Sequence, residues 1–209
     1  MPRQPQSHSR GRADGRADRH DTGIVVPIRS FRFGKGRLAS ALDDDARIAL
    51  AQRMADTVIA AAAPRPTVIV SSAPEVAQWC DANGLARLDD PGSLDGAADA
   101  GRRWTLERGL DRVVVVHGDL PFATTLDDVA GDGAAAIAVL VPDHRGDGTP
   151  VCALPVGAPF AFAYGAGSFA RHCAEAARVG LELRIVRDEA LGFDVDLPED
   201  LARLESPCP

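Results

Sequence analysis

VVVVHGDLPF, residues 113–122, is the stretch that decides the fold class. Four consecutive valines are typical of a strand buried on both faces, the kind found inside parallel sheets. Pro121 cannot donate a sheet hydrogen bond, so the strand must end near it. Ligands of open α/β sheets bind beyond the carboxyl ends of the strands. Asp119 is therefore expected either at a ligand site or as a simple cap of the turn.

Strand-like and helix-like patterns alternate through the rest of the chain. Further strands are expected at residues 24–28, 67–70, 85–88, 135–141, 151–155, 183–186 and 193–196, with 151–155 antiparallel. Helices are expected at residues 43–63, 74–83, 94–108 and 168–180, and a last one begins at PEDLARL. Repeated strand–helix–strand units predict a single-domain, Rossmann-like α/β fold with a mostly parallel sheet flanked by helices.

Both ends of the chain are expected to lie outside this fold. Residues 1–22 contain one methionine and no other large hydrophobic residue. Such a segment cannot bury enough apolar surface to offset the entropy lost on ordering. We therefore expect a disordered leader over 1–22, one domain over 23–205 and a frayed tail over 206–209.

Composition narrows the class of protein. The 209 residues are 45% hydrophobic and carry a net charge of −7, which argues against nucleic acid or an anionic membrane as a partner. No apolar run approaches the roughly 18–20 residues that a membrane helix needs. The four cysteines form no Cys-x-x-Cys pair and no zinc-like spacing with histidine. Reduced thiols of this kind predict a cytoplasmic protein.

A basic loop, residues 29–37, follows the first strand. Arg29, Arg32, Lys35 and Arg37 lie in it with two glycines and no acid. A glycine-containing basic loop that leaves a strand suits a polyphosphate, although a solvated basic loop has the same composition. The spacing matches neither the P-loop nor the dinucleotide-binding fingerprint.

Two acids lie close together in FDVDLPEDL, residues 193–201. In a strand, Asp194 and Asp196 would project to the same face because they are two residues apart. Asp196 also begins a capping-box pattern with Glu199, and a capping role alone could explain it. Together with Asp119, these acids favour Mg²⁺, a hard cation that binds nucleotides through carboxylates.

A third feature combines DGTP, residues 147–150, with YGAGSF, residues 164–169. Gly165 and Gly167 lead into Ser168, which is expected to cap the next helix. Free N–H groups at a helix start suit a phosphate or carboxylate, while an ordinary serine cap is the alternative. The chain has no nucleophile motif, and His117 and His172 are expected to be buried and hydrogen-bonded. These features suit nucleotidyl transfer, in which positioning and charge neutralisation dominate.

From about Ile24 to Leu204 the chain resembles the 2-phospho-L-lactate/phosphoenolpyruvate guanylyltransferases of coenzyme F420 biosynthesis, which have a single-domain nucleotidyltransferase fold. The resemblance rests on VVPIRSFRFGKGRL (25–38), GDLP (118–121), DGT (147–149), YGAGSFARH (164–172) and FDVDLPEDL (193–201). It implies GTP as donor and Mg²⁺ as cofactor. It also implies a phosphorylated three-carbon acid as acceptor, namely phosphoenolpyruvate, 2-phospho-L-lactate or 3-phospho-D-glycerate.

The resemblance also implies roles for individual residues. Mg²⁺ would be held by Asp119, Asp194 and Asp196, and the acceptor by Thr149, Gly165 and Ser168. Lys35 and Arg37 would neutralise the triphosphate and, with Asp119, carry catalysis. Arg29 and Asp95 would complete the nucleotide site. The acceptor phosphate would attack the α-phosphorus without a general base, because a phosphate monoester has a second pKa of about 6. Passage of the product to the next transferase of the pathway is a further expectation.

Three positions depart from the family pattern. Asp95 replaces a usual asparagine, Pro150 replaces another, and Arg29 stands where lysine is common. These changes leave the implied metal ligands in place, but they bear on the choice of nucleotide and acceptor. Two alternatives therefore stay open: a molybdenum-cofactor guanylyl- or cytidylyltransferase, and a nucleotide-binding protein without catalysis. Turnover that depends on Mg²⁺ would separate the last from both enzymes.

Overall fold

The computed structural model describes residues 21–131 and 136–205. Its strands, in chain order, are β1 (Thr22–Pro27), β2 (Thr67–Val70), β3 (Ala86–Leu88), β4 (Arg112–Val116), β5 (Ile137–Val141), β6 (Val151–Pro155) and β7 (Glu182–Ile185). Its helices are η1 (Gly36–Ser40, 3-10), α1 (Asp44–Ala62), α2 (Pro74–Asn83), α3 (Leu94–Glu107), α4 (Asp127–Ala130), α5 (Ser168–Arg178), α6 (Glu189–Gly192) and α7 (Pro198–Glu205).

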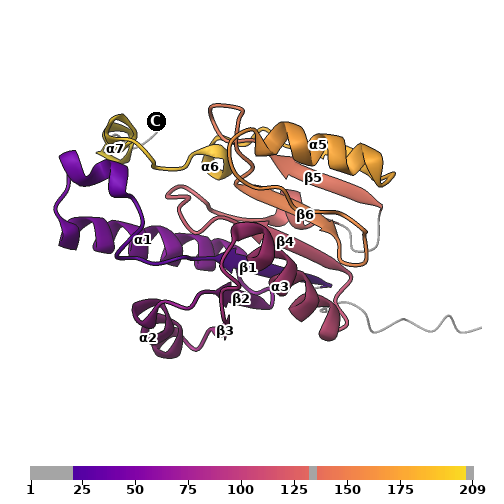
Figure 1. Cartoon of the computed structure of the whole chain (residues 1–209), viewed down its shortest axis with the longest axis horizontal. Helices are drawn as coiled ribbons and strands as arrows, with labels where there is room; N and C mark the ends of the chain where they lie inside the picture. The colour runs from indigo at the N-terminus through magenta and orange to yellow at the C-terminus, as the bar shows by residue number, and fades with distance from the viewer. Residues whose placement is uncertain (1–20, 132–135, 206–209) are drawn as a thin grey trace, which may run out of the picture.

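The described strands form one seven-stranded sheet in the order β3-β2-β1-β4-β6-β5-β7 (Figure 1). Strand β6 is antiparallel to both of its neighbours, β4 and β5. The other pairs are parallel, so the remaining strands run in one direction. The predicted fold class, with its mostly parallel sheet and its antiparallel strand at 151–155, is confirmed.

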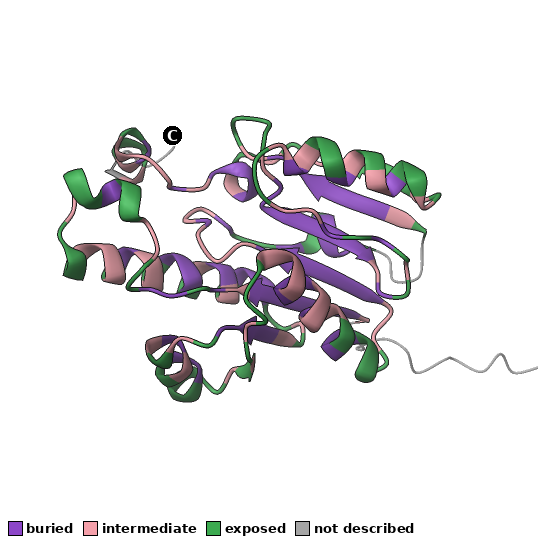
Figure 2. Cartoon of the chain, viewed as in Figure 1, coloured by how far each residue is buried: buried purple, intermediate pink, exposed green. Residues whose placement is uncertain are grey.

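The valine strand lies in the middle of the sheet and is buried on both faces (Figure 2). Val114 and Val116 pack on the face that α1, α2 and α4 cover. Val113 and Val115 pack on the opposite face, with α3 and α5. Burying both faces of one strand requires apolar residues without alternation, which is the pattern that four consecutive valines supply.

Local signals in the sequence begin the helices close to the expected positions. The side chain of Asp43 accepts a hydrogen bond from the Ala46 N–H at 2.8 Å and caps α1. Ser93 caps α3 in the same way through the Gly96 N–H, at 3.1 Å. Gly101 lets α3 pack closely on β1, because a Cβ there would lie 2.1 Å from Cγ1 of Val25.

One expected strand is absent: residues 193–196 form no strand. Their alternation is real, because Phe193 and Val195 are buried in a small core with Leu38, Leu50 and Met54. That core belongs to η1, α1 and α7 rather than to the sheet. Period-two alternation shows which residues face inward, but it does not show whether a neighbouring strand is there to pair with them.

The chain ends were also considered in the sequence analysis. Thr22, placed there in the leader, is the first residue of β1. The rest of that leader except Asp21, and the tail 206–209, lie outside the described residues. None of the helices within 21–131 and 136–205 combines the length and apolar character that crossing a bilayer requires.

Candidate active site

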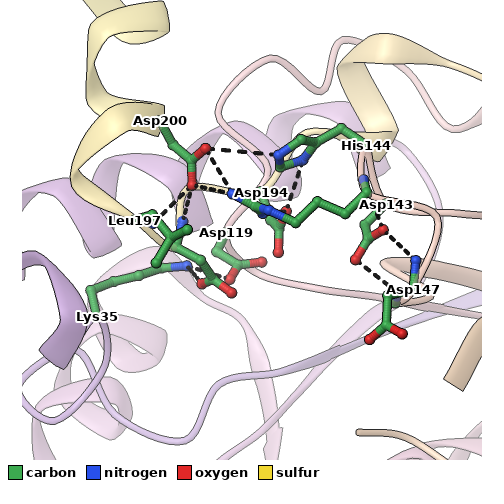
Figure 3. A network of polar contacts seen from close by, with 11 residues as sticks. Lys35, Asp119, Asp143, His144, Asp147, Asp194, Leu197 and Asp200 are labelled. Carbon is green, nitrogen blue, oxygen red and sulfur yellow. Dashed lines mark hydrogen bonds and ion pairs between the residues drawn. The ribbon is translucent and has the colours of Figure 1, made fainter. Parts of the chain in front are cut away.

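Polar side chains from distant parts of the chain meet at the carboxyl edge of the sheet (Figure 3). Strands β1 and β4 are parallel neighbours, so the segments that follow them emerge side by side. Lys35 follows β1, and Asp119 follows β4. Asp194 and Asp196 arrive from the segment between α6 and α7, residues 193–197, which we call the carboxylate segment.

Lys35 joins two of these carboxylates. Its Nζ lies 2.6 Å from Oδ2 of Asp119 and 3.0 Å from Oδ1 of Asp196, and its side chain is only 7% exposed. Its backbone is left-handed, with φ 58°, in a residue that carries a Cβ. Such a conformation persists only where the surrounding structure holds it, and it is concentrated at functional sites. The sequence analysis placed Lys35 in the site, but it did not predict this strain.

Charge pairing outweighs burial in this pair. Burial alone would lower the pKa of Lys35, but the charges of Asp119 and Asp196 raise it above its ordinary value. Burial would raise the pKa of Asp119, but the ammonium of Lys35 holds it below its ordinary value. Both groups are therefore ionised at neutral pH, and the site presents fixed charges to any ligand.

Asp194 lies beside the pair and carries the opposite perturbation. Burial, followed by the charges of Asp119 and Asp196, raises its pKa. Oδ1 of Asp119 and Oδ1 of Asp194 are buried and accept no hydrogen bond from a described residue, although Oδ1 of Asp194 has ion-pair contacts with His144 and Arg145 at 3.3 and 3.7 Å. Carboxylate oxygens with unused lone pairs in a negative site are the donors that Mg²⁺ takes, so the residues fit that ion. No set of three ligands within the described chain is already arranged around a metal position.

The predicted cap of the last helix is wrong. Asp196 directs its carboxylate to Lys35 and not to the start of α7. Asp200 instead reaches back, and its Oδ2 accepts the N–H groups of Asp196 at 2.9 Å and Leu197 at 2.8 Å. Pro198 at the first helical position has no N–H that needs a cap, and Asp200, two residues later in the same turn, bonds the N–H groups that precede the helix. Asp196 is thereby left available to the site.

Arg145 and His144, which the sequence analysis did not single out, also belong to this network. Nη2 of Arg145 lies 3.0 Å from each oxygen of Asp200, and Nη1 lies 3.7 Å from Oδ1 of Asp194. Nδ1 of His144 lies 3.3 Å from the same Asp194 oxygen. No local sequence motif predicts the Arg145–Asp200 and His144–Asp194 pairs, because the two members of each pair are about fifty residues apart in the sequence.

The turn that carries Arg145 is held by its own aspartates. We call residues 142–149 the acceptor loop. The carboxylate of Asp143 accepts the N–H groups of Arg145, Asp147 and Gly148 at 2.8 to 3.1 Å. Oδ2 of Asp147 accepts the Gly167 N–H at 3.0 Å and so joins the loop to the start of α5. An aspartate that opens a glycine-containing turn is a signal that could have identified Asp143.

Two of the three predicted acceptor residues meet in a buried cluster. Oγ1 of Thr149 lies 3.3 Å from Oγ of Ser168 and 3.0 Å from Nδ1 of His172, and all three residues are at most 2% exposed. The predicted serine cap is wrong, because the N-cap of α5 is Gly167, with φ 70°, and no side chain caps this helix. The left-handed backbone at Gly167 starts the helix and turns Ser168 inward toward Thr149.

The remaining predicted residues are exposed or make other contacts. Arg29 and Arg37 are exposed on either side of Lys35, in the basic loop and in η1. Gly165 is exposed and has φ 104°, a conformation that glycine adopts readily. Asp95 lies in the first turn of α3, and its Oδ1 accepts the Tyr164 N–H at 2.6 Å. Asp95 therefore fastens α3 to the segment before α5, and whether it also contacts a nucleotide stays a prediction.

A cavity of about 460 Å³ lies elsewhere, between α1 and α2. It shares Phe31 and Arg32 with the basic loop, but none of the acids of the sheet edge line it. Its one carboxylate, Glu75, is already hydrogen-bonded to Ser30 at 2.5 Å. Converging charges are a better guide to chemistry than volume, so we assign the site to the carboxylates and not to this cavity.

Comparisons with known proteins agree with this geometry. Residues 22–205 match the family model described as "Guanylyl transferase CofC like". The chain belongs to this family. A phosphoenolpyruvate guanylyltransferase from Rubrobacter xylanophilus is 36% identical over 191 residues, which span 87% of this chain and 92% of that protein. A 2-phospho-L-lactate guanylyltransferase from Halorubrum lacusprofundi is 32% identical over 187 residues, 87% of this chain and 82% of that protein. The resemblance inferred from the motifs is confirmed.

Solved structures support the fold of this guanylyl transferase family member. One protein from Desulfovibrio desulfuricans, described as a nucleotide-diphospho-sugar transferase, superposes with a TM-score of 0.72 at 17% identity, covering 88% of this chain and 86% of its own. A nucleotidyl transferase from Methanothermobacter gives a TM-score of 0.62 at 15% identity, covering 88% and 95%. At such identities the likeness establishes the fold and leaves function to the site.

Proposed function

We propose that this protein transfers GMP from GTP to the phosphate of a three-carbon acid in coenzyme F420 biosynthesis and releases pyrophosphate. Membership of the guanylyl transferase family supports the reaction and favours it over the molybdenum-cofactor alternative. One observation carries the assignment to this site. The ammonium of Lys35 is held between Asp119 and Asp196 at the carboxyl edge of the sheet, where the ligands of such sheets bind.

Each side of the reaction has a set of residues. Lys35, Arg29 and Arg37 carry positive charge that would pair with a triphosphate, and the two arginines are exposed in the chain segment around Lys35. Thr149 and Ser168 meet beside the start of α5, and the exposed Gly165 lies just before that helix. We assign the nucleotide to the first set and the phosphorylated acid to the second.

The transfer needs no protein nucleophile. An oxygen of the acceptor phosphate forms a bond to the α-phosphorus of GTP, and the bond from that phosphorus to the bridging oxygen breaks. Pyrophosphate leaves with the electron pair of that bond. Because the attacking phosphate is already largely ionised at neutral pH, the protein has to bring two anions together and stabilise the charge that develops. We assign that role to Lys35 and Arg37.

Mg²⁺ is part of this proposal, with Asp119, Asp194 and Asp196 as its ligands. Two buried carboxylate oxygens without hydrogen-bond partners support the assignment. When bound, the ion would add positive charge at the phosphates and relieve their repulsion. Lys35 contacts two of the same carboxylates, so it would share them with the ion, and its ammonium would also pair with the phosphates of the nucleotide.

The experiment that tests the function is pyrophosphate release. Each of the four common nucleoside triphosphates is offered with phosphoenolpyruvate, 2-phospho-L-lactate or 3-phospho-D-glycerate, with and without Mg²⁺. We expect release only with GTP, one of the acids and Mg²⁺. Silence across the grid, with GTP still bound, would support the non-catalytic alternative and would point to Asp95 and Pro150.

Asp119→Asn is the matched variant for this assay. It keeps the size of the side chain and removes the charge that Lys35 contacts, so we expect turnover to fall by about a hundredfold or more while circular dichroism stays unchanged. An unfolded variant would show that Asp119 is structural. An active one would remove it from the site. Hand-off of the product to a following transferase and a cytoplasmic location stay predictions from the sequence.

A further inference from the structure

The carboxylate segment lacks the support that a sheet gives. Residues 193–196 form no strand, so no ladder of backbone hydrogen bonds fixes Asp194 and Asp196. Asp200 supplies a substitute, because one of its oxygens accepts the N–H groups of both Asp196 and Leu197. Asp200 is 5% exposed, so its carboxylate is held inside the protein and makes a fixed anchor for the segment.

Arg145 fixes Asp200 in turn and reaches the site itself. Nη2 lies 3.0 Å from both oxygens of Asp200, while Nη1 lies 3.7 Å from Asp194. Two nitrogens of one rigid, planar group thus span the anchor and one of the site acids. A lysine at this position would keep the charge, but its single nitrogen could not fix the distance between two carboxylates.

Arg145 also belongs to the acceptor loop, which lies directly against the start of the carboxylate segment. The His144 N–H donates to the Gly192 carbonyl at 2.7 Å. A Cβ at Gly192 would lie 2.9 Å from the carbonyl oxygen of Pro142, so the two backbones pass in contact. The same loop ends at Thr149, which lies in the buried cluster with Ser168 and His172. One short loop therefore contacts Asp194 through His144, as Figure 3 shows, and contacts Ser168 through Thr149.

We propose that Arg145 is a positioning residue that acts through Asp200, setting Asp194 and Asp196 at a fixed place relative to the acceptor loop. The proposal rests on the proposed function, because it assigns to these acids a ligand whose placement matters. It extends that function, because it couples the acceptor side of the site to the cation side. Any shift of the loop moves Arg145, and Arg145 moves the anchor of the two acids.

The test compares Arg145→Lys with Arg145→Gln. Arg145→Lys keeps the positive charge and loses the second nitrogen, while Arg145→Gln loses both. Arg178→Lys is the control, because Arg178 makes two bonds of 2.6 and 2.7 Å to Glu175 on the surface of α5, and Arg178 has no part in the site. The readouts are kcat and KM for GTP transfer, thermal unfolding, and binding of Mn²⁺ followed by the electron paramagnetic resonance of the free ion.

If Arg145 positions the acids, Arg145→Lys lowers kcat and weakens Mn²⁺ binding by roughly tenfold or more each. The melting temperature should stay within a few degrees, because Arg145→Lys keeps a cation opposite the buried Asp200 and the guanidinium itself is about a third exposed. The control should match the wild type in every readout. Because Mn²⁺ binding needs no turnover, it decides the positioning role even if wild-type protein transfers nothing from GTP, which would overturn the proposed function alone.

Two results would overturn the proposal. If Arg145 acts only as a charge, Arg145→Lys matches the wild type, and Arg145→Gln binds Mn²⁺ more tightly because a cation beside Asp194 has gone. If Arg145 serves only the fold, both variants lose melting temperature, while kcat per folded molecule and Mn²⁺ binding stay at wild-type values.

Discussion

Acidification should destabilise this protein, and His172 makes one contribution that can be isolated. Its ring is fully buried, Nε2 accepts the Ala163 N–H at 3.0 Å, and Nδ1 lies 3.0 Å from Oγ1 of Thr149. Nε2 must therefore be unprotonated, and Nδ1 carries the single proton and donates it to Thr149. A second proton on Nε2 would face the Ala163 N–H and break that hydrogen bond.

The size of the effect follows from the pKa. Burial, with the nearby charges of Arg171 and His117, lowers the pKa of His172 from 6.5 to about 4. In the unfolded chain, His172 therefore binds a second ring proton below about pH 6.5. In the folded protein it binds that proton only below about pH 4. The stabilisation is complete above the unfolded pKa and is lost as pH falls through this window. At 1.36 kcal/mol per pKa unit, the loss by pH 4 is about 3 kcal/mol.

Urea unfolding at pH 7.0, 5.5 and 4.0 measures this loss directly, with His172→Gln as the comparison. A glutamine amide can accept from Ala163 and donate to Thr149, but it does not titrate in this range. Carboxylates that protonate at low pH affect both proteins alike, so their contribution cancels in the difference. We expect wild-type protein to lose about 3 kcal/mol more than the variant between pH 7 and pH 4. Two parallel pH profiles would refute the reasoning, whatever the stability of the variant at pH 7.

Two further predictions concern packing and the acceptor cluster. Thr149→Val removes the hydroxyl shared by Ser168 and His172, so we expect a stability loss of about 1–3 kcal/mol and a higher KM for the acid acceptor, with the KM for GTP unchanged. Initial rates with each substrate varied in turn test this, and a rise in both KM values would contradict the assignment. Gly101→Ala places a methyl group 2.1 Å from Cγ1 of Val25, so we expect a loss of about 1–3 kcal/mol in urea unfolding. An unchanged unfolding midpoint would show that α3 can move away from β1 without cost.

The sequence predicts a strand or a helix start well where the residues of that element are enough to specify it. Val113 to Val116 must be buried on both faces, and only a central strand satisfies that demand. Asp43 and Ser93 each cap a helix from within its first turn, so local sequence is enough to place both helix starts. In these cases no distant partner is needed to specify the element.

Prediction from the sequence fails where residues far away in the chain determine the local structure. Phe193 and Val195 alternate with Asp194 and Asp196 as they would in a strand, but the apolar pair packs on helices, and none of the described strands pairs with it. Ser168 precedes a helix as a cap should, yet the left-handed backbone of Gly167 takes that position and leaves the hydroxyl for Thr149.

The residues of the site were also predicted only where the local sequence identified them. Lys35 and Asp119 were predicted for the site from the segments that follow two strands, and the structure brings them together. Arg145 and Asp200 were not, because their contact spans fifty-five residues and is made by side chains of common types. One sequence by itself contains no signal for such a pair.

The position of the carboxylate segment determines which parts of the protein can be removed or exchanged separately. The last of the seven described strands ends at Ile185. Two of the three site acids come later in the chain, in the carboxylate segment, which packs on η1 and α1. A chain that ends between Ile185 and Asp194 would keep every described strand and lose both acids. The carboxylate segment and α7 could also be exchanged between relatives, provided that both proteins have the Arg145 and Gly192 contacts that hold the segment in place.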